Sequence, residues 1–301
     1  MEAPVTLTLP EIPSLVGVGH LLGLVGTGIG PSLTPALHER EGDAQGMRTL
    51  YRRLDLDALE LAADDVGRVL DAARLTGFSG LNVTHPAKQT VLRHLDRIDP
   101  DAAALGAVNT VVFGPHGAIG HNTDRSGFAR SFRRGLPGAA VDRVLLLGAG
   151  GAGAAVAHAM TDVGVGELLV ADADRARAEA LAAAVRETGR ATTAVVAKAD
   201  VEDALATVDG LVHATPTGMA AHPGTPVAPH ALHERLWVAD VVYRPLATAL
   251  VTAARARGAR VLDGGGMAVF QAVDAFRLFT GVEPDADRML DHFAGLVAAG
   301  A

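Results

Sequence analysis

Cysteine is absent from the 301 residues of the chain. Disulfide bonds, thiolate metal ligands and cysteine nucleophiles are therefore all excluded. The absence is compatible with a reducing compartment, and we expect a cytoplasmic protein. Any chemistry must come from hydroxyl, amide, carboxylate, imidazole and ammonium groups.

An excess of positive charge and long apolar runs are also missing. The 26 basic and 34 acidic side chains give a formal net charge of -8, which attracts neither nucleic acid nor anionic lipid. No apolar run is long enough to cross a bilayer. Near the N-terminus, acidic Glu2 and the prolines Pro4, Pro10 and Pro13 replace the basic region and apolar core of a signal peptide. We expect no signal peptide, no membrane contact, no nucleic-acid partner, and a monomer or homodimer.

Motifs for metal binding and for hydrolysis are lacking as well. Among the twelve histidines, His230 and His233 have helical spacing, but no third ligand and no HExxH glutamate accompany them. We therefore expect no metal site. Ser32 lacks the GxSxG turn that activates a hydrolase nucleophile. Three further histidines are interpreted as structural residues that form hydrogen bonds: His38, His121 and His213.

The composition of the chain is typical of a packed α/β enzyme. Hydrophobic residues make up 49% and charged residues 20%, and the length favours two domains. In the first part, apolar patterns predict strands at 21–29, 49–54 and 78–83, and a hairpin over 108–121 that turns at 114–117. Helices are predicted after the turn at 31–35, over 56–75, and from Pro86.

The second part alternates strands and helices more regularly. Strands are predicted at 144–147, 168–171, 193–197, 211–214, 238–242 and 260–262, and helices at 152–163, 175–188 and 247–257. This alternation predicts right-handed crossovers and a doubly wound parallel sheet. Helices at 267–279 and 285–298 are expected to pack back on the first domain. We therefore predict an N-terminal αβ domain (1–123 plus 264–301) and a second, Rossmann-type domain (124–263).

A glycine-rich turn follows the first strand of that second domain. Gly148, Gly150 and Gly153 form a GxGxxG pattern between an apolar strand and an Ala-rich helix, which is the context required for dinucleotide binding. Asp172 follows the next strand and can accept hydrogen bonds from the ribose hydroxyls of NAD. No basic residue stands directly beside it, so NADP is disfavoured. The predicted cofactor contacts of this region are Gly148, Gly150, Gly151, Ala152, Gly153, Asp172 and Arg177.

Further short motifs occur in a fixed order along nearly the whole chain. In the first half they are 32–38 (SLTPALH), 82–88 (NVTHPAK), 106–110 (GAVNT) and 122–124 (NTD). In the second half they are the glycine-rich turn, 214–219 (ATPTGM), 240–243 (DVVY), and 263–267 (DGGGM) followed by Gln271. In order and spacing the chain resembles the shikimate and quinate dehydrogenase family.

The resemblance implies roles for individual residues. Lys88 would be the acid/base residue and Asp124 its partner, which fits the need of alcohol oxidation for a positioned base. We also expect Lys88 to lie in the first turn of the helix after Pro86, where the helix dipole disfavours its ammonium. The implied substrate-binding residues are Ser32, Thr34, Thr84, Asn109, Tyr243 and Gln271. The remaining implied cofactor contacts are Thr215, Thr217, Val242, Gly264 and Met267.

Two positions depart from the pattern of most biosynthetic members of this family. Thr34 stands where those members resemble one another in having serine, and Asp172-Ala173 stands where they have an asparagine-arginine pair for a 2′-phosphate. Both features are similar to the NAD-linked quinate/shikimate branch. The resemblance thus implies an NAD-dependent oxidoreductase that interconverts quinate with 3-dehydroquinate and shikimate with 3-dehydroshikimate.

Two alternatives stay open at this point. One is a dehydrogenase of amino-substituted quinate or shikimate in secondary metabolism. The other is a catalytically silent module that binds the ring acid or NAD. Single residues also have structural interpretations: Ser32 and Thr34 could cap a helix, Asp124 could be an N-cap, Lys88 a solvated side chain, and Tyr243 a core aromatic.

Overall fold

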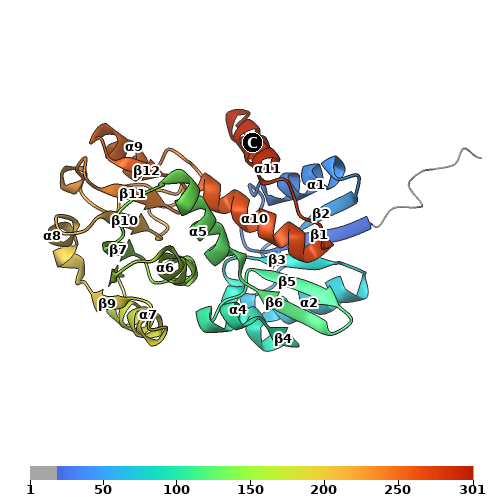
Figure 1. Ribbon diagram of the computed structural model, residues 1–301. Helices are drawn as coiled ribbons and strands as arrows, with labels where there is room; N and C mark the ends of the chain where they lie inside the picture. The colour runs from blue at the N-terminus through green and yellow to red at the C-terminus, as the bar shows by residue number, and fades with distance from the viewer. Residues whose placement is uncertain (1–18, 301) are drawn as a thin grey trace, which may run out of the picture.

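A computed structural model describes residues 19–300, which form two lobes, each built around a six-stranded sheet (Figure 1). The expectation about a signal peptide concerns Glu2 to Pro13 and lies outside the described residues. Within residues 19–300, no helix combines the length and the apolar composition needed to cross a membrane. In the same range, no group of three or more histidine, aspartate or glutamate side chains is arranged to hold a metal ion.

The first sheet is mixed. Its strands are β1 (Gly19–Gly26), β2 (Arg48–Asp55), β3 (Gly80–Val83), β4 (Arg97–Ile98), β5 (Thr110–Gly114) and β6 (Gly117–His121), in the order β2-β1-β3-β5-β6-β4. β1 is parallel to β2 and β3, whereas β5 is antiparallel to β3 and β6. The predicted hairpin is confirmed, because Gly114 pairs with Gly117 across the turn.

The helices of this lobe correct one prediction. They are α1 (Thr34–Ala44), η2 (Ala63–Asp65), α2 (Val66–Leu75), α3 (Ala87–Thr90), η3 (Val91–His94) and α4 (Pro100–Leu105). The helix predicted over 56–75 begins only at Val66, so its first part was wrong. The Leu56 N–H donates to the Gly26 carbonyl at 2.8 Å, and Glu60 has φ +56°, which a right-handed helix does not accept.

The second sheet is entirely parallel, as predicted. Its strands are β7 (Arg143–Leu147), β8 (Glu167–Ala171), β9 (Thr192–Val195), β10 (Gly210–His213), β11 (Trp237–Asp240) and β12 (Arg260–Leu262), in the order β12-β11-β10-β7-β8-β9. The order reverses between β7 and β10, and ligands of such sheets bind in the crevice beyond the carboxyl ends of the strands at that point.

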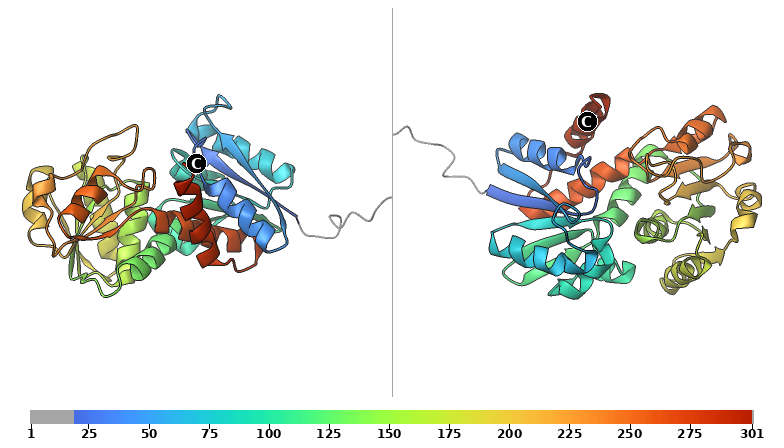
Figure 2. Two further views of the ribbon diagram at one scale, coloured as in Figure 1. Left: turned by 90° about the horizontal axis from the view of Figure 1, so that it is seen from above. Right: turned by 180° about the vertical axis from the view of Figure 1, so that it is seen from behind.

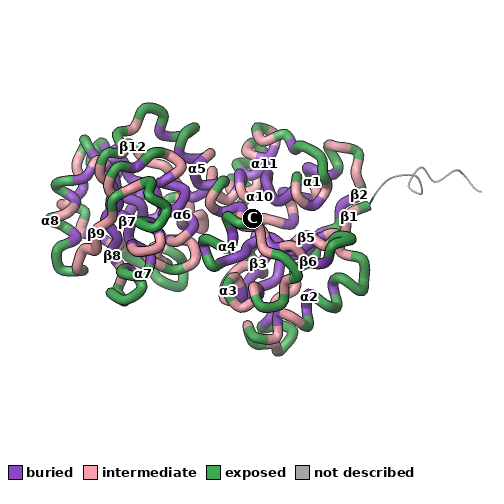
Figure 3. Tube along the Cα trace, turned by 60° about the horizontal axis from the view of Figure 1, so that its bottom comes forward, coloured by how far each residue is buried: buried purple, intermediate pink, exposed green. Residues whose placement is uncertain are grey.

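Helices cover both faces of this sheet. They are α6 (Gly151–Val163), α7 (Arg175–Glu187), η4 (Lys198–Asp200), α8 (Val201–Leu205), η5 (Pro229–Ala231) and α9 (Ala249–Ala256). Alternate residues of β7 point to opposite faces: Val144 and Leu146 join the core with α6 and α7, while Leu145 joins the core with α8 and α9. Figure 3 shows the buried segments in both lobes, with exposed turns around them.

Two helices run side by side between the lobes, α5 (Thr123–Gly135) and α10 (Gly265–Thr280) (Figure 1). α5 leads from the first sheet into the second lobe, where buried Phe128 and Phe132 pack on the second sheet. The sequence patterns did not predict α5. The last helix, α11 (Ala286–Ala298), lies against α1 (Figure 2), where Arg288 binds the buried Glu41 carboxylate at 2.6 Å. The helical return onto the first lobe is therefore present.

Candidate functional site

Lys88 and Asp124 meet between the lobes. Lys88 lies on α3 and Asp124 in the first turn of α5, and Nζ is 2.6 Å from Oδ2. Asn122 caps α5, since its Oδ1 accepts hydrogen bonds from the N–H groups of Asp124 and Arg125. The cap is thus Asn122 and not Asp124, whose side chain is only 10% exposed and binds the ammonium. This geometry holds one Lys88 N–H on the carboxylate and leaves the others for a ligand.

The expected helix-dipole effect on Lys88 does not match the structure. α3 has only four residues, Ala87–Thr90, and continues as the 3₁₀ turn η3. Because the macrodipole is a sum over aligned peptide units, one turn produces little of it. The environment of Lys88 is therefore set by Asp124 and by its partial burial.

A buried polar cluster fixes the start of α5. The Asn109 amide donates to Thr123 Oγ1 at 3.0 Å, and its oxygen accepts from the Thr123 N–H at 2.8 Å and the Thr110 hydroxyl at 3.0 Å. Asn82 donates to Thr110 Oγ1 and accepts from the Tyr51 hydroxyl. Asn109 therefore positions the residue before Asp124. The sequence analysis gave no role to Asn82, Thr110 or Thr123, although each of them lies in one of the motifs.

Ser32, Thr34 and Tyr243 come together from the two lobes. Ser32 Oγ donates to Thr34 Oγ1 at 3.1 Å and accepts from the Thr34 N–H at 3.3 Å. Burial raises the pKa of the Tyr243 hydroxyl, while the charges of Arg244 and Lys88 and a hydrogen bond with Ser32 act in the opposite direction. Tyr243 thus lies close to both Ser32 and Lys88. The residue at the N-cap of α1 is Leu33, so neither hydroxyl residue occupies that position.

Thr84 and Gln271 border the same region. Thr84 follows β3, and its N–H donates to the Val25 carbonyl at 2.9 Å. The residue is half-buried. Gln271 lies on α10, where its backbone packs on Gly127, one turn after Asp124 on the same side of α5. Its side-chain amide donates to the Ala268 carbonyl at 2.9 Å.

The glycine-rich turn has the geometry that the sequence predicts. Gly148 has φ +105°, and a Cβ there would lie 2.6 Å from the Ala214 carbonyl oxygen. A Cβ on Gly150 or Gly151 would meet no atom within 4 Å, so the space beside these two glycines at the start of α6 is open. A phosphate fits this cradle. A side chain at Gly153 would overlap the Gly148 carbonyl, which explains the third glycine.

Asp172 reaches this turn from the end of β8. One carboxylate oxygen accepts the Ala149 N–H at 2.7 Å, and the other accepts the Asp174 N–H at 2.8 Å. The nearby basic side chains are exposed and paired with acids: Arg177 with Asp174 at 3.3 Å and Arg175 with Glu179 at 2.7 Å. The group at this turn that is available to the ribose of an adenosine is therefore the Asp172 carboxylate and not a basic side chain.

The other predicted cofactor residues lie near the crevice between β7 and β10. Thr215 follows β10, and its methyl group is 3.0 Å from where a Gly148 Cβ would stand. Gly264 precedes α10, and a Cβ there would lie 2.5 Å from the Val242 carbonyl. Gly264 therefore forms a close approach between backbones at the start of a helix. Thr217 donates its N–H to Thr215, and Met267 is partly buried on α10.

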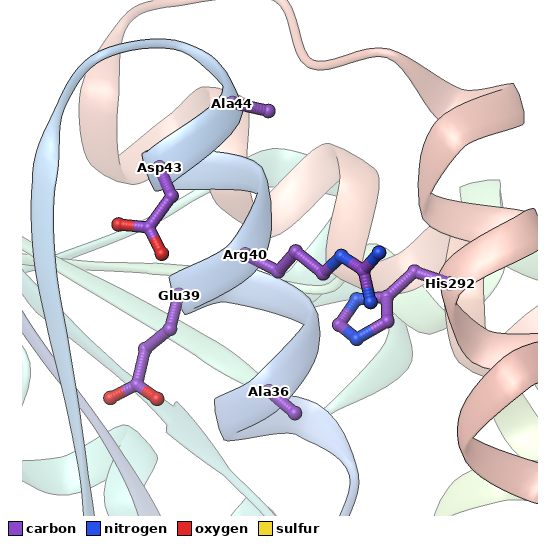
Figure 4. A pocket seen from close by; sticks show the side chains of 6 residues that line it. All are labelled: Ala36, Glu39, Arg40, Asp43, Ala44 and His292. Atoms are coloured by element: carbon purple, nitrogen blue, oxygen red, sulfur yellow. The ribbon is translucent and has the colours of Figure 1, made fainter.

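Two surface hollows lie outside this group of residues. One lies between α1 and α11 (Figure 4) and is lined by Ala36, Glu39, Arg40, Asp43, Ala44 and His292. A second is lined in part by Asn122, Thr123 and Arg125, beside the start of α5. Neither includes Lys88 or Gly148, so the candidate site is defined by its side chains and glycine turn.

The three histidines interpreted as structural differ in outcome. His213 forms hydrogen bonds, as predicted. His38 contradicts the prediction, because neither ring nitrogen has a hydrogen-bond partner. Its ring stacks on Tyr51 at 5.0 Å in an aromatic cluster, and burial lowers its pKa to about 3. His121 Nδ1 lies 3.8 Å from the Asp99 carboxylate.

Comparison with known proteins identifies the family. The family model described as "Shikimate dehydrogenase substrate binding domain" matches residues 24–111, and "Shikimate 5'-dehydrogenase C-terminal domain" matches residues 264–292. A shikimate dehydrogenase (NADP(+)) of Streptomyces avermitilis is 58% identical over 94% of this chain and 97% of its own length. A quinate/shikimate dehydrogenase (NAD(+)) of Corynebacterium glutamicum is 52% identical over 92% and 98%.

A solved structure agrees with these sequence relatives. It is a quinate dehydrogenase from Corynebacterium glutamicum in complex with NAD, which superposes with a TM-score of 0.88 at 51% identity, over 92% of this chain and 99% of that one. Both the sequence match and the superposition extend over nearly the whole length. The chain therefore belongs to the shikimate/quinate dehydrogenase family of oxidoreductases.

Proposed function

We propose that this protein is an NAD-preferring dehydrogenase that interconverts quinate with 3-dehydroquinate and shikimate with 3-dehydroshikimate. The observation that carries the proposal is the 2.6 Å contact between Lys88 and Asp124, on elements that meet between the two lobes. Relatives over 50% identical are named as dehydrogenases of these two ring acids.

Lys88 is assigned the proton transfer. In the direction of oxidation its neutral amine accepts the proton of the ring hydroxyl, and in the direction of reduction its ammonium donates that proton to the carbonyl oxygen. Asp124 orients Nζ and stabilises the ammonium form. The nicotinamide cofactor, when bound, supplies or accepts the hydride.

The substrate-binding residues fix the ring. Ser32, Thr34 and Tyr243 form a cluster of neutral hydroxyl groups near Lys88, and we assign them to the substrate carboxylate. Thr84, Asn109 and Gln271 are assigned to the carboxylate or ring hydroxyls. Holding the ring at several points directs one C–H bond toward the cofactor.

The cofactor preference is assigned to Asp172. The glycine turn from Gly148 to Gly153 receives the pyrophosphate, and Asp172 accepts hydrogen bonds from the adenosine ribose. A 2′-phosphate at that place would face the carboxylate, and residue 173 is alanine. Further contacts are assigned to Arg177, Thr215, Thr217, Val242, Gly264 and Met267.

The same assignment divides the chain into domains. We assign residues 1–123 and 264–301 to the substrate domain and residues 124–263 to the NAD-binding domain. In support, α5 starts at Thr123 directly after the first sheet, and α10 and α11 return to the first lobe. The site then lies where the two domains face each other.

Initial rates with quinate and with shikimate, each with NAD and NADP, test the proposal. We expect reduction of NAD with both acids, and a kcat/KM about 100-fold lower with NADP because of the charge repulsion at Asp172. Faster turnover of an aminoquinate or aminoshikimate in competition would contradict the substrate assignment. The absence of reduced cofactor with every acid would identify a binding module instead.

A further inference from the structure

A buried hydrogen-bonded network connects the ends of two adjacent strands at the crevice. His213 ends β10 and Asp240 ends β11, and the two residues are register partners in the sheet. Nδ1 of His213 is 2.9 Å from Asp240 Oδ1, and Nε2 is 2.5 Å from Thr215 Oγ1. The side chains of His213 and Asp240 are both 0% exposed.

The hydrogen bonds of this network are continuous. The Thr217 N–H donates to Thr215 Oγ1 at 3.3 Å, and the Thr215 hydroxyl pairs with His213 Nε2. The other ring nitrogen pairs with the Asp240 carboxylate. Both ring nitrogens of His213 therefore have a partner, and the contacts run without a break from Thr217 to Asp240.

Asp240 also accepts hydrogen bonds from two residues other than His213. Its Oδ1 accepts the Val242 N–H at 3.0 Å, and its Oδ2 accepts the Thr248 hydroxyl at 2.7 Å. Thr248 in turn caps α9 through the Val251 N–H. These bonds fix the chain that leads through Val242 to Tyr243, and the His213 arm is the one that reaches Thr215.

Thr215 is the member of the network that lies at the glycine turn. Its methyl group contacts the space beside Gly148, and the loop from Thr215 to Thr217 follows β10 at the point where the strand order reverses. Fixing one side-chain rotamer there removes conformational freedom that cofactor binding would otherwise have to remove.

We propose that His213 is a positioning residue: supported by Asp240, it holds the Thr215 hydroxyl and thereby keeps the loop 215–217 in the conformation that receives the nicotinamide cofactor. This inference rests on the proposed function, because it assumes a dinucleotide at Gly148. His213 itself touches neither substrate nor cofactor, since its side chain is fully buried.

Two substitutions of His213 each keep one hydrogen bond of the imidazole ring and remove the other. In His213→Asn the amide nitrogen takes the place of Nδ1, so the bond to Asp240 remains and the bond to Thr215 is lost. In His213→Gln the amide reaches the place of Nε2, so the opposite contact remains. Thr215→Val removes only the hydroxyl group of a half-buried residue and serves as the variant with the least risk to folding.

Steady-state kinetics and NADH titration by fluorescence test the proposal. We expect His213→Asn and Thr215→Val each to raise the KM for NAD and the Kd for NADH about fivefold to tenfold, the effect of losing one buried hydrogen bond. In His213→Asn the KM for quinate and kcat should stay within about twofold, because the bonds from Asp240 toward Tyr243 remain. The double variant should lose no more than either single variant, since both remove the same bond.

Other outcomes overturn the inference in distinguishable ways. An unchanged KM for NAD in both variants, or a lower unfolding temperature without a change in KM, would show a purely structural role for His213. Losses that multiply in the double variant would show that His213 does not act through Thr215. If instead the unaltered protein reduces no cofactor with either acid, the proposed function fails, and the Kd for NADH in the variants still tests the role of His213.

Discussion

At the scale of single residues, Asp172 is the residue to which we assign the proposed preference for NAD over NADP. Its carboxylate is held at the glycine turn by the Ala149 and Asp174 N–H groups. Asp172→Asn combined with Ala173→Arg should raise the ratio of kcat/KM for NADP to that for NAD by about 100-fold, because a repulsive charge is exchanged for an attractive one. Initial rates with both cofactors measure the ratio.

Arg175→Ala is the matched control for this exchange. Arg175 is exposed and already paired with Glu179, so its removal should change the cofactor ratio by less than about threefold. A ratio that stays unchanged in the double variant, or that shifts as far in Arg175→Ala, would show that Asp172 does not set the preference.

Functional residues that stand in or next to a sequence motif could be predicted from the sequence. Residues whose role depends on a contact with a distant part of the chain could not. Lys88 is the last residue of a family motif, and Asp172 follows a strand after a glycine turn, so both were candidates. Asn82 and Thr110 meet only because β3 and β5 pair in one particular register. His38 is adjacent to Tyr51 only through the packing of α1 on β2, so its unpartnered nitrogens have no counterpart in sequence spacing.

At the scale of elements, the contact between α5 and α10 depends on Gly127. A Cβ there would lie 2.7 Å from the backbone nitrogen of Gln271, so Gly127→Ala forces the helices apart. We expect the free energy of unfolding to fall by about 2 kcal/mol, as for other overpacked sites. kcat should fall as well, because Asp124 and Gln271 are carried by these helices. Denaturant unfolding and initial rates measure the two effects.

Gly295→Ala provides the comparison for this prediction. Gly295 lies inside α11 and is exposed, and a Cβ there would meet no atom within 4 Å. Alanine should therefore stabilise the helix by about 0.5–1 kcal/mol and leave kcat unchanged. Equal losses in both variants would mean that the close approach at Gly127 does not matter.

The helix α5 shows why some elements escaped prediction. Phe128 and Phe132 have the spacing of a buried helical face, and each contributes about 2 kcal/mol by burial. The glycines and arginines around them weaken that pattern, and Gly127 is explained only by α10. Residues 56–62 show the opposite error, because a helix was predicted there and the structure has none. Their apolar spacing matches a helix, but the Leu56 N–H donates to the carbonyl of Gly26 in β1.

At the scale of the whole molecule, buried histidines set the response of stability to acid. Burial lowers the pKa of His38 to about 3 and lowers that of His121 and His158 as well. Between the ordinary histidine pKa of about 6.5 and the folded value, the unfolded chain binds protons that the folded chain does not. The free energy of unfolding therefore decreases as the pH falls below about 6.5.

His38→Phe should remove the largest part of this dependence. Phenylalanine keeps the stacking on Tyr51 and has no unpartnered nitrogen, so the variant should be more stable at neutral pH by about 1–3 kcal/mol. Its advantage should grow by about 2 kcal/mol between pH 6.5 and pH 5. Urea unfolding at both pH values checks this, with the exposed hairpin variant His116→Asn as control. Parallel pH curves for His38→Phe and the unaltered protein would contradict the assignment.

The division into two lobes was predictable, and their junction was not. Regular alternation of strands and helices indicated the second sheet and its parallel strands, because strand-helix-strand units join parallel strands by right-handed crossovers. The cross-lobe contacts, such as that of Arg244 with the Pro31 carbonyl at 2.6 Å, depend on the relative placement of elements distant in sequence. Only the family motifs indicated that Lys88 and Asp124 face the same ligand.

The proton transfer assigned to Lys88 is tested most directly by Lys88→Met, compared with Lys198→Met at an exposed lysine of η4. We expect kcat with quinate and NAD to fall about 1000-fold in Lys88→Met, the scale of general acid-base catalysis, and to stay within about twofold in the control. The Kd for NADH should be unchanged in both variants. A Lys88→Met protein that binds NADH and quinate and turns over at the rate of the unaltered protein would contradict the mechanism.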